Sequence, residues 1–429
     1  MKKRLGTGGR QDQTIANQRL VGRRSLLRGG LAAASLAGAA AKSARADESI
    51  GDNAPPWMKK PGRSFSAYGV PAKAQESVQR TFGAPPGRPG TGVTQTPLQS
   101  LEGTITPSGL HFERHHNGVP EIDPAQHQLV IHGLVKRPLA FSVDALQRYP
   151  METHIHFIEC SGNSGGYSAP QPRQAAAGVM NGLVSCSEWT GVRLSTLLGE
   201  AEVASGAKWV VAEGADAAAM SRSVPIEKCL DDAMVALFQN GEAIRPEQGY
   251  PMRLLLPGWE GNMHVKWLRR LKVTDAPVDA RDETSHYTEL MPDGKARQYM
   301  FLQGVKSIIL KPSFGLNLQR PGVYEISGLA WSGGGRIAKV DVSTDGGKTW
   351  VAAPLSEPVL SKALTRFRLS WQWDGRPATL LSRATDETGD TQPTRAAWLA
   401  QYAPGQFYHY NGICAWSVEA DGMVKNVYA

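Results

Sequence analysis

The chain has 429 residues, of which 41% are hydrophobic and 11 are tryptophan, so it can form a sizeable core and more than one average domain. Its formal net charge of +8 comes from residues 1–46, which hold ten Lys or Arg and one acid, leaving 37 basic and 38 acidic residues elsewhere. Because nucleic-acid binding requires a retained basic face, this balance argues against a nucleic-acid-binding protein.

The N-terminal segment has the features of an export signal. The pair Arg23-Arg24 is followed by a short apolar stretch, residues 31–41, and by an A-x-A-like cleavage point at 44–46. The stretch is too short and too rich in Ala and Gly for a membrane span. An ordinary signal peptide or a basic tail is the alternative, but the order of features favours twin-arginine export. We expect a signal peptide over 1–46 and a periplasmic protein without a membrane span.

The next part of the chain predicts an arm and then a mixed domain. Residues 47–109 are rich in Pro, Gly, Ser and Thr, which is typical of an extended arm. Over 110–290 strands and short helices alternate irregularly, which indicates an α+β fold rather than βαβ units. The expected strands are 129–131, 155–158, 209–211, 252–256 and 264–273, and the expected helices are 142–146 and 192–198.

A change of pattern near residues 280–300 indicates a second domain over 295–429. Residues 366–373 alternate polar and apolar side chains, which is the period of a half-buried strand. Short strands separated by turns predict an immunoglobulin-like β-sandwich. Its expected strands are 337–343, 349–351, 366–373 and 380–386, with a Gly-rich turn at 345–348.

The four cysteines are Cys160, Cys186, Cys229 and Cys414, and none lies in a CxxC or zinc-like spacing. An oxidising compartment permits up to two disulfides among them, and the sequence leaves open which thiols are free. No CxxCH is present, so no covalent c-type haem is expected on this chain.

Three clusters carry residues suited to chemistry. The first is the segment 112–120, where Arg114, His115 and His116 could donate hydrogen bonds to an anion. A polar surface loop is the alternative interpretation, and it is the better one for this segment taken alone.

The second cluster is Cys160, which ends an apolar strand and enters a loop of Ser, Gly and Asn at 161–166. A loop of small residues lets the backbone approach a ligand closely, and a thiolate favours soft or high-valent metals. A buried structural cysteine is the usual outcome for one isolated thiol and stays open here.

The third cluster combines Arg253, inside an apolar strand, with His264 and Lys266. A buried guanidinium needs an anionic partner. The spacing of His264 and Lys266 places both on one side of an extended strand. A structural ion pair with an acid from another segment explains Arg253 equally well.

Taken in order, these motifs resemble the sulfite oxidase family of molybdopterin enzymes over about residues 105–429. They are Arg114-His115-His116 with Val119-Pro120, Cys160-Ser161-Gly162-Asn163, Tyr250-Pro251-Met252-Arg253 and the His-Val-Lys-Trp-Leu at 264–268. The resemblance implies a molybdopterin domain followed by an immunoglobulin-like dimerisation domain, and therefore a homodimer.

The resemblance also implies the site. Cys160 corresponds to the thiolate ligand of molybdenum in a molybdenum–pterin cofactor, and Arg114 and Tyr287 to residues that orient the reacting oxygens. Gln248 stands where the family often has His. The residues implied to bind the cofactor are Phe112, Arg114, His116, Asp216, Gln248, Arg253, His264, Val265 and Lys266.

Two departures bear on the substrate. Gly165 and Asn411 stand where sulfite oxidases have arginines, and each lost charged contact is worth about 1.5–3 kcal/mol. This pattern is similar to the molybdenum subunits of sulfane dehydrogenases. The similarity implies a sulfane sulfur on a carrier protein as the substrate, oxygen taken from water, and a separate c-type cytochrome subunit as electron acceptor.

Three other interpretations stay open. A free-sulfite dehydrogenase differs at the positions of Gly165 and Asn411. A methionine-sulfoxide reductase of the same superfamily would lack the second domain. From a different class, the chain could be a non-catalytic periplasmic binding module that contains no molybdenum.

Overall fold

The computed structural model describes residues 54–85 and 87–429. The expected signal peptide at 1–46 and the first residues of the expected arm lie outside this part. The chain divides into two compact units, residues 1–70 and 71–429. The described part of the first unit holds one short 3-10 helix, η1 (Pro56–Met58). No helix in the described residues is long and apolar enough to cross a membrane.

The second unit begins with a three-stranded antiparallel sheet, which differs from the expected arm. Its strands are β1 (Thr81–Gly83), β2 (Gly92–Gln95) and β3 (Glu113–His115), in the order β1-β2-β3. The 3-10 helices η2 (Lys73–Gln75), η3 (Leu98–Ser100) and η4 (Ser108–Leu110) complete this region. Leu98 is 2% exposed and belongs to the core. Residues 81–109 are therefore part of the folded domain rather than an extended arm. Strand β2 pairs with β3 and so positions Arg114.

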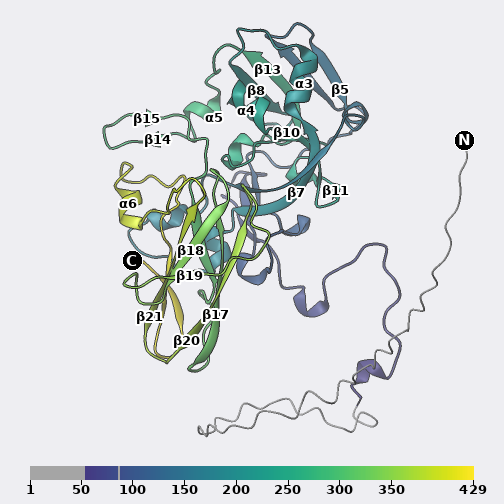
Figure 1. Ribbon diagram of the computed structural model, residues 1–429. Helices are drawn as coiled ribbons and strands as arrows, with labels where there is room; N and C mark the ends of the chain where they lie inside the picture. The colour runs from purple at the N-terminus through teal and green to yellow at the C-terminus, as the bar shows by residue number, and fades with distance from the viewer. Residues whose placement is uncertain (1–53, 86) are drawn as a thin grey trace, which may run out of the picture. The chain divides into compact units, whose positions relative to one another are not determined.

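The domain that follows contains two five-stranded sheets (Figure 1). The first has the order β5-β4-β13-β8-β9, and only β13 and β4 are parallel in it. Its strands are β4 (Gln128–Gly133), β5 (Leu139–Ser142), β8 (Trp209–Gly214), β9 (Ser221–Pro225) and β13 (Leu268–Thr274). The second has the order β11-β10-β7-β6, with β12 on β10. Its strands are β6 (Glu152–Glu159), β7 (Val184–Arg193), β10 (Met234–Gln239), β11 (Glu242–Ala243) and β12 (Arg253–Leu255).

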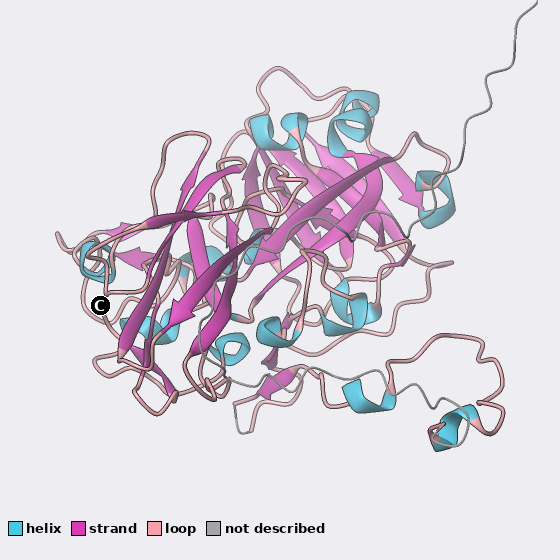
Figure 2. Ribbon diagram, turned by 60° about the horizontal axis from the view of Figure 1, so that its bottom comes forward, coloured by secondary structure: helices cyan, strands magenta, loops and turns pink. Residues whose placement is uncertain are grey.

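Short helices cover these sheets (Figure 2). They are α1 (Val143–Leu146), α2 (Ala177–Asn181), α3 (Leu194–Ala201), α4 (Ile226–Asp231) and α5 (Arg281–Thr284), with 3-10 turns η5 (Gly165–Ser168), η6 (Pro246–Gln248) and η7 (Gly261–Met263). The Ser142 side chain caps α1 by accepting from the Ala145 N–H. Helix α3 starts two residues later than expected, because Val192 and Arg193 still pair with β10.

The expected strand over 264–273 is wrong in its first half. Strand β13 begins only at Leu268, whereas His264 to Trp267 follow η7 as an irregular segment in which Trp267 has φ 53°. His264 and Lys266 therefore do not share a side of a strand. The apolar residues 265 and 267 imitate strand alternation, but the left-handed backbone at Trp267 breaks the ladder.

The C-terminal domain is a β-sandwich of a three-stranded and a five-stranded sheet (Figure 1). The first is β16 (Lys306–Lys311), β17 (Gly322–Trp331) and β20 (Thr365–Trp373); the second is β18 (Ile337–Ser343), β19 (Val351–Ala353), β21 (Ala378–Asp386), β22 (Ala415–Val418) and β23 (Val424–Val427). Thr349 and Trp350 belong to the turn before β19. The hairpin β14 (Glu289–Leu290) and β15 (Ala296–Arg297) precedes the sandwich, and α6 (Arg395–Leu399) lies before β22.

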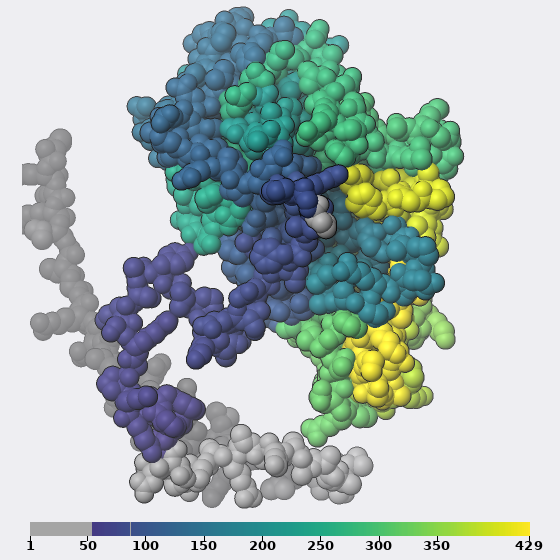
Figure 3. Space-filling model, turned by 180° about the vertical axis from the view of Figure 1, so that it is seen from behind, coloured from purple at the N-terminus to yellow at the C-terminus, as the bar shows by residue number. Residues whose placement is uncertain are grey.

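The sandwich and the preceding domain share one hydrophobic core. Phe157, Val184 and Cys186 pack in the same cluster as Trp331 and Phe367 of the sandwich. Figure 3 shows the segment near residues 165–180 lying against the C-terminal strands. Polar contacts agree, since Arg395 donates to the carbonyl oxygens of residues 167 and 169. The loop that follows Cys160 is therefore held from both domains.

Candidate active site

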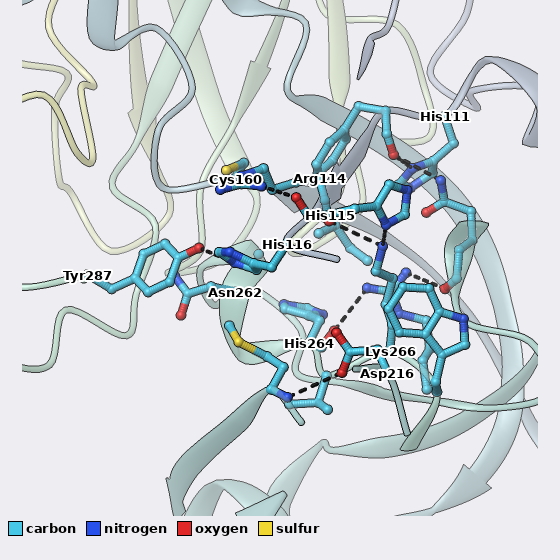
Figure 4. A pocket seen from close by; sticks show the side chains of 18 residues that line it. His111, Arg114, His115, His116, Cys160, Asp216, Asn262, His264, Lys266 and Tyr287 are labelled. Carbon is cyan, nitrogen blue, oxygen red and sulfur yellow. Dashed lines mark hydrogen bonds between the residues drawn. The ribbon is translucent and has the colours of Figure 1, made fainter. Parts of the chain in front are cut away.

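A pocket between β3, β6, η6, β12 and η7 gathers the residues that the sequence singles out. It encloses about 700 Å³ including its open mouth, which is within the range of cofactor sites. Figure 4 shows Cys160, His116 and Tyr287 toward one end and His111, Lys266 and Asp216 toward the other. All the site residues expected from the sequence line it: Phe112, Arg114, His116, Cys160, Asp216, Gln248, Arg253, His264, Val265, Lys266 and Tyr287.

Cys160 is placed at the pocket wall by the end of β6. Its N–H donates to the Leu183 carbonyl at 2.9 Å, and its carbonyl accepts from the Asn163 N–H at 2.8 Å. The Asn163 carboxamide joins the two sides of the loop, because its Nδ2 donates to Glu159 Oε1 and its Oδ1 accepts from the Leu183 N–H. Cys160 is 9% exposed, and burial raises the pKa of its thiol. A bound cation would be needed to favour the thiolate.

A buried ion pair supports this loop from the sandwich domain. Lys306 Nζ lies 3.0 Å from Glu159 Oε1 and also donates to Ser164 Oγ at 2.7 Å. The Trp331 indole N–H donates to Glu159 Oε2 at 2.6 Å. Both carboxylate oxygens of Glu159 are thus satisfied next to Cys160, which fixes the backbone on both sides of the thiol.

All four cysteines lie in the described part of the chain, and none forms a disulfide there. Cys186, Cys229 and Cys414 are each at most 3% exposed and pack in hydrophobic cores. Cys160 alone of the four lines the pocket. Cys160 is therefore in a position to bind a ligand in the pocket, whereas Cys186, Cys229 and Cys414 are core residues.

The end of the pocket opposite Cys160 holds more basic side chains than its single carboxylate, Asp216, can balance. Arg253 is 3% exposed and donates to the carbonyl oxygens of Gln248 and His264 at 2.9 and 3.2 Å. Its Nε has no hydrogen-bond partner, and burial alone lowers its pKa to about 9. Among the described residues Arg253 forms no ion pair, so the structure removes the alternative of a protein salt bridge.

Lys266 repeats this pattern beside Arg253. Its Nζ donates to the carbonyl oxygens of Arg114 and Glu247 and to His115 Nδ1 at 2.9 Å. Burial lowers its pKa well below the usual value, and the charge of Arg253 lowers it further. Asp216 is the one acidic side chain among the described residues that line the pocket. The arrangement favours a bound anion strongly.

His115 is a pocket residue that the sequence did not single out from its neighbours. Because its Nδ1 accepts from Lys266, its Nε2 carries the proton and donates to Glu113 Oε2 at 2.8 Å. Arg80 pairs with the same Glu113 carboxylate. His111 and Asn262 also line the pocket unforeseen. The adjacent histidines in the sequence signal a site, but spacing cannot tell which ring faces inward.

At the mouth, His116 and Tyr287 face each other. The Tyr287 hydroxyl lies 3.2 Å from His116 Nε2, and the Arg222 guanidinium lies 5.4 Å from the centre of the Tyr287 ring. Burial, and then the charge of Arg114, lowers the pKa of His116 to about 4. Burial raises the pKa of Tyr287. Near neutral pH both groups are therefore uncharged hydrogen-bonding groups.

The two positions of missing arginines lie outside this lining. The Asn411 side chain donates to the Val305 carbonyl at 3.2 Å. A side chain at Gly165 would meet Phe407 atoms at 2.7 and 2.8 Å. Neither position adds charge to the mouth.

A buried clamp fixes the segment that runs over the Cys160 loop. The His409 ring binds Glu260 Oε2 at 2.7 Å and Glu289 Oε1 at 2.6 Å, and the His409 N–H donates to the Ser161 carbonyl at 2.7 Å. Burial alone would lower the pKa of His409, but Glu260 and Glu289 raise it to about 9. The charged ring therefore joins both domains and the β14–β15 hairpin.

This clamp predicts a pH-dependent stability. A His with a raised pKa contributes stability that is complete below its unfolded pKa of about 6.5 and is lost as the pH rises through about 9. We expect the free energy of unfolding to fall by up to about 3 kcal/mol across this window. Urea unfolding at pH 6 to 9.5 measures it, and His409→Gln should remove most of the slope.

His127 offers the matched control. It is buried and donates only to the Leu268 carbonyl, and burial lowers its pKa, so its contribution changes on the acidic side instead. His127→Gln should leave the slope above pH 6.5 intact. An equal slope in wild type and His409→Gln would show that the clamp is not a charged pair.

Comparison with known proteins agrees with the architecture and the pocket. Residues 116–281 match the oxidoreductase molybdopterin binding domain, and residues 297–414 match the Mo-co oxidoreductase dimerisation domain. The crystal structure of the sulfane dehydrogenase SoxCD from Paracoccus pantotrophus superposes with a TM-score of 0.85 and 46% identity, covering 88% of this chain and 98% of that one.

Curated relatives match at lower identity. A nitrate reductase from Ulva prolifera is 30% identical over 69% of this chain, and the mitochondrial sulfite oxidase of Mus musculus is 29% identical over 74%. The chain spans 39% of the first protein's length and 61% of the second's. The fold and the pocket define a molybdopterin oxidoreductase. The chain belongs to the sulfite oxidase family, which confirms the α+β fold with a molybdopterin domain followed by a dimerisation domain.

The pocket fits such a cofactor on its own chemistry. Two buried nitrogens that line it, Arg253 Nε and His111 Nε2, have no hydrogen-bond partner. Among the described residues neither Arg253 nor Lys266 forms an ion pair, although Glu113 and Asp216 act on Lys266 from a greater distance. An anionic phosphate would supply what these groups lack. Cys160 offers a thiol at the other end, as a soft metal ligand requires.

Proposed function

We propose that this protein is a periplasmic molybdenum oxidoreductase that oxidises a sulfane sulfur held on a carrier protein. Each oxygen added to sulfur comes from a water molecule, which releases two protons, while the sulfur gives up two electrons. The electrons pass to a separate c-type cytochrome subunit. The observation that carries the proposal is one pocket in which the Cys160 thiol lies opposite two buried basic side chains, Arg253 and Lys266, neither of which forms an ion pair among the described residues.

The side chains divide into a binding end and a reacting end. Arg253 and Lys266 would hold the anionic end of the pterin, with Gln248 and His264 fixing the position of Arg253 through their carbonyl oxygens. Cys160 would bind the metal. When bound, the cofactor supplies two-electron oxygen transfer at molybdenum.

At the reacting end, Arg114 and Tyr287 would orient the reacting groups. The Tyr287 hydroxyl stays protonated because burial raises its pKa, so it can donate a hydrogen bond to a developing negative oxygen. The neutral His116 ring, whose Nε2 lies 3.2 Å from the Tyr287 hydroxyl oxygen, orients this hydroxyl group. Cys160 itself is 9% exposed, so its thiol lies at the pocket wall rather than in open solvent.

The small number of charged side chains at the pocket mouth favours a sulfur carried on a protein over free sulfite as the substrate. With Gly165 and Asn411 outside the lining, Arg114 is the only arginine near the thiol among the described pocket residues. A small dianion would lose two charged contacts there, whereas a sulfur presented on a protein needs access more than charge. The similarity to a sulfane dehydrogenase at 46% identity supports the same choice.

The export route and the assembly form part of the proposal. Arg23-Arg24 with the apolar stretch at 31–41 supports twin-arginine export, which suits a protein that folds around its cofactor before crossing. The match of residues 297–414 to a dimerisation domain supports a homodimer through the sandwich.

The test compares two donors on one preparation. Molybdenum is quantified first, and about one per chain is expected; none under good supply would favour the non-catalytic binding module. Cytochrome c reduction is then followed with free sulfite and with a persulfidated carrier protein. We expect kcat/KM for the carrier to exceed that for sulfite by at least about tenfold. A preference for sulfite would identify a sulfite dehydrogenase instead.

A further inference from the structure

Phe407 of the sandwich domain lies over the Cys160 loop at the place where a side chain at position 165 would go. A Cβ built at Gly165 would lie 2.7 Å from the Phe407 carbonyl oxygen and 2.8 Å from its ring Cδ2. Contacts below 3.0 Å with backbone do not occur, so no other residue fits without moving Phe407. Glycine at 165 and phenylalanine at 407 are therefore one packing unit.

The Phe407 ring also approaches the thiol. A Cβ at Gly162 would lie 3.4 Å from Phe407 Cε2 and 4.0 Å from Cys160 Sγ. The ring and the sulfur thus bound the same small space beside the loop. Phe407 nevertheless remains 45% exposed. A large aromatic ring that is half open to solvent beside the reacting end is available to contact a substrate.

Phe407 continues an aromatic wall that reaches Tyr287. The rings of Phe407 and Tyr408 lie 4.2 Å apart, and those of Tyr408 and Tyr287 lie 5.6 Å apart. The wall is fixed in place because the next residue, His409, donates to the Ser161 carbonyl and holds Glu260 and Glu289. Side-chain motion at the mouth is therefore restricted from the second domain.

We propose that Phe407 determines substrate specificity, presenting with Gly165 an uncharged aromatic wall that accepts a chain of sulfur atoms and excludes small oxyanions. Divalent sulfur makes favourable contacts with aromatic rings. The negative face of an aromatic ring repels an anion instead. This inference rests on the proposed sulfur oxidation and names the residue that selects among sulfur donors.

The experiment uses the full-length, molybdenum-loaded protein in five forms: wild type, Phe407→Ala, Gly165→Ala, the double variant, and Phe314→Ala as control. Phe314 is a half-buried phenylalanine packed on the sandwich core. Neither ring is part of the pocket lining itself, but Phe407 lies against the Cys160 loop at Gly162 and Gly165. Phe407→Ala should lower the kcat/KM ratio of persulfidated carrier over sulfite at least tenfold, and Phe314→Ala should leave it unchanged. Gly165→Ala should reduce carrier turnover in both backgrounds, because its Cβ also meets the Phe407 carbonyl oxygen, but the reduction should be smaller in Phe407→Ala, where the ring contact is gone.

A binding measurement separates this inference from the proposed function. Sulfate affinity, measured by calorimetry, should rise at least about tenfold in Phe407→Ala whether or not the carrier is a substrate. If the wild-type protein oxidises no persulfide but Phe407→Ala still binds sulfate more tightly, the proposed substrate is wrong and the inference about Phe407 is supported. If Phe407→Ala does not load molybdenum, Phe407→Leu takes its place. A ratio and a sulfate affinity within twofold of wild type would overturn the inference, as would additive effects of Gly165→Ala and Phe407→Ala.

Discussion

Replacing Cys160 by serine is expected to abolish turnover of every sulfur donor while the fold survives. Serine has nearly the same shape, and the backbone bonds of Cys160 to Leu183 and Asn163 do not involve the side chain. What is lost is the soft thiolate, because a hydroxyl is a poor ligand for such a metal. Changes around metal ligands cost about 10–100-fold in activity, so loss of a ligand should exceed 100-fold. Steady-state kinetics, molybdenum content and the unfolding midpoint measure the three effects.

Cys229 provides the matched control for that variant. It lies in α4, is 1% exposed, and packs in the core of the catalytic domain away from the pocket. Cys229→Ser should lower the free energy of unfolding, since it places a hydroxyl in an apolar core, but should keep kcat once the protein is folded. Normal turnover by Cys160→Ser would remove Cys160 from the reaction.

The sequence predicted the location of the site better than its construction. Four ordered motifs were sufficient to select residues that converge on one pocket, although their individual roles stay predictions. The groups that hold the pocket in shape were not foreseen. Lys306 supports Glu159 across 147 positions of sequence, and His409 reaches Glu260 across 149. Such contacts depend on how the two domains dock, and no local pattern records that.

The fold shows the same division between local and long-range information. The strands β4, β6, β18 and β20 were expected because side chains alternate or stay apolar along them. The sheet β1-β2-β3 was missed because its strands are only three or four residues long and lack a run of apolar side chains, so backbone pairing rather than a hydrophobic pattern defines them. The segment 264–267 was misread because alternation cannot reveal a left-handed residue at Trp267.

Replacing Arg253 by methionine is expected to have opposite effects on the cofactor and on the empty protein. Without this guanidinium the anionic end of the cofactor loses its best-placed buried donor, so molybdenum and pterin content should fall at least about tenfold. The cofactor-free protein should instead become more stable, because Arg253 is a buried charge without a carboxylate and burial lowers its pKa to about 9. Allowing for two lost hydrogen bonds, we expect a gain of about 1–2 kcal/mol in the free energy of unfolding.

Arg222 provides the control for the expected gain in stability of Arg253→Met. Arg222 is as deeply buried, but it lies 3.6 Å from Glu260 and 4.0 Å from Glu283. Removing it leaves the buried Glu283 carboxylate without a cation, whereas Glu260 still pairs with His409. Arg222→Met should therefore destabilise the same cofactor-free protein by about 3–5 kcal/mol. Urea unfolding of the three apo-proteins compares them. Destabilisation of similar size in both variants would mean that Arg253 has a protein partner, and the cofactor would no longer be needed to explain why a guanidinium is buried there.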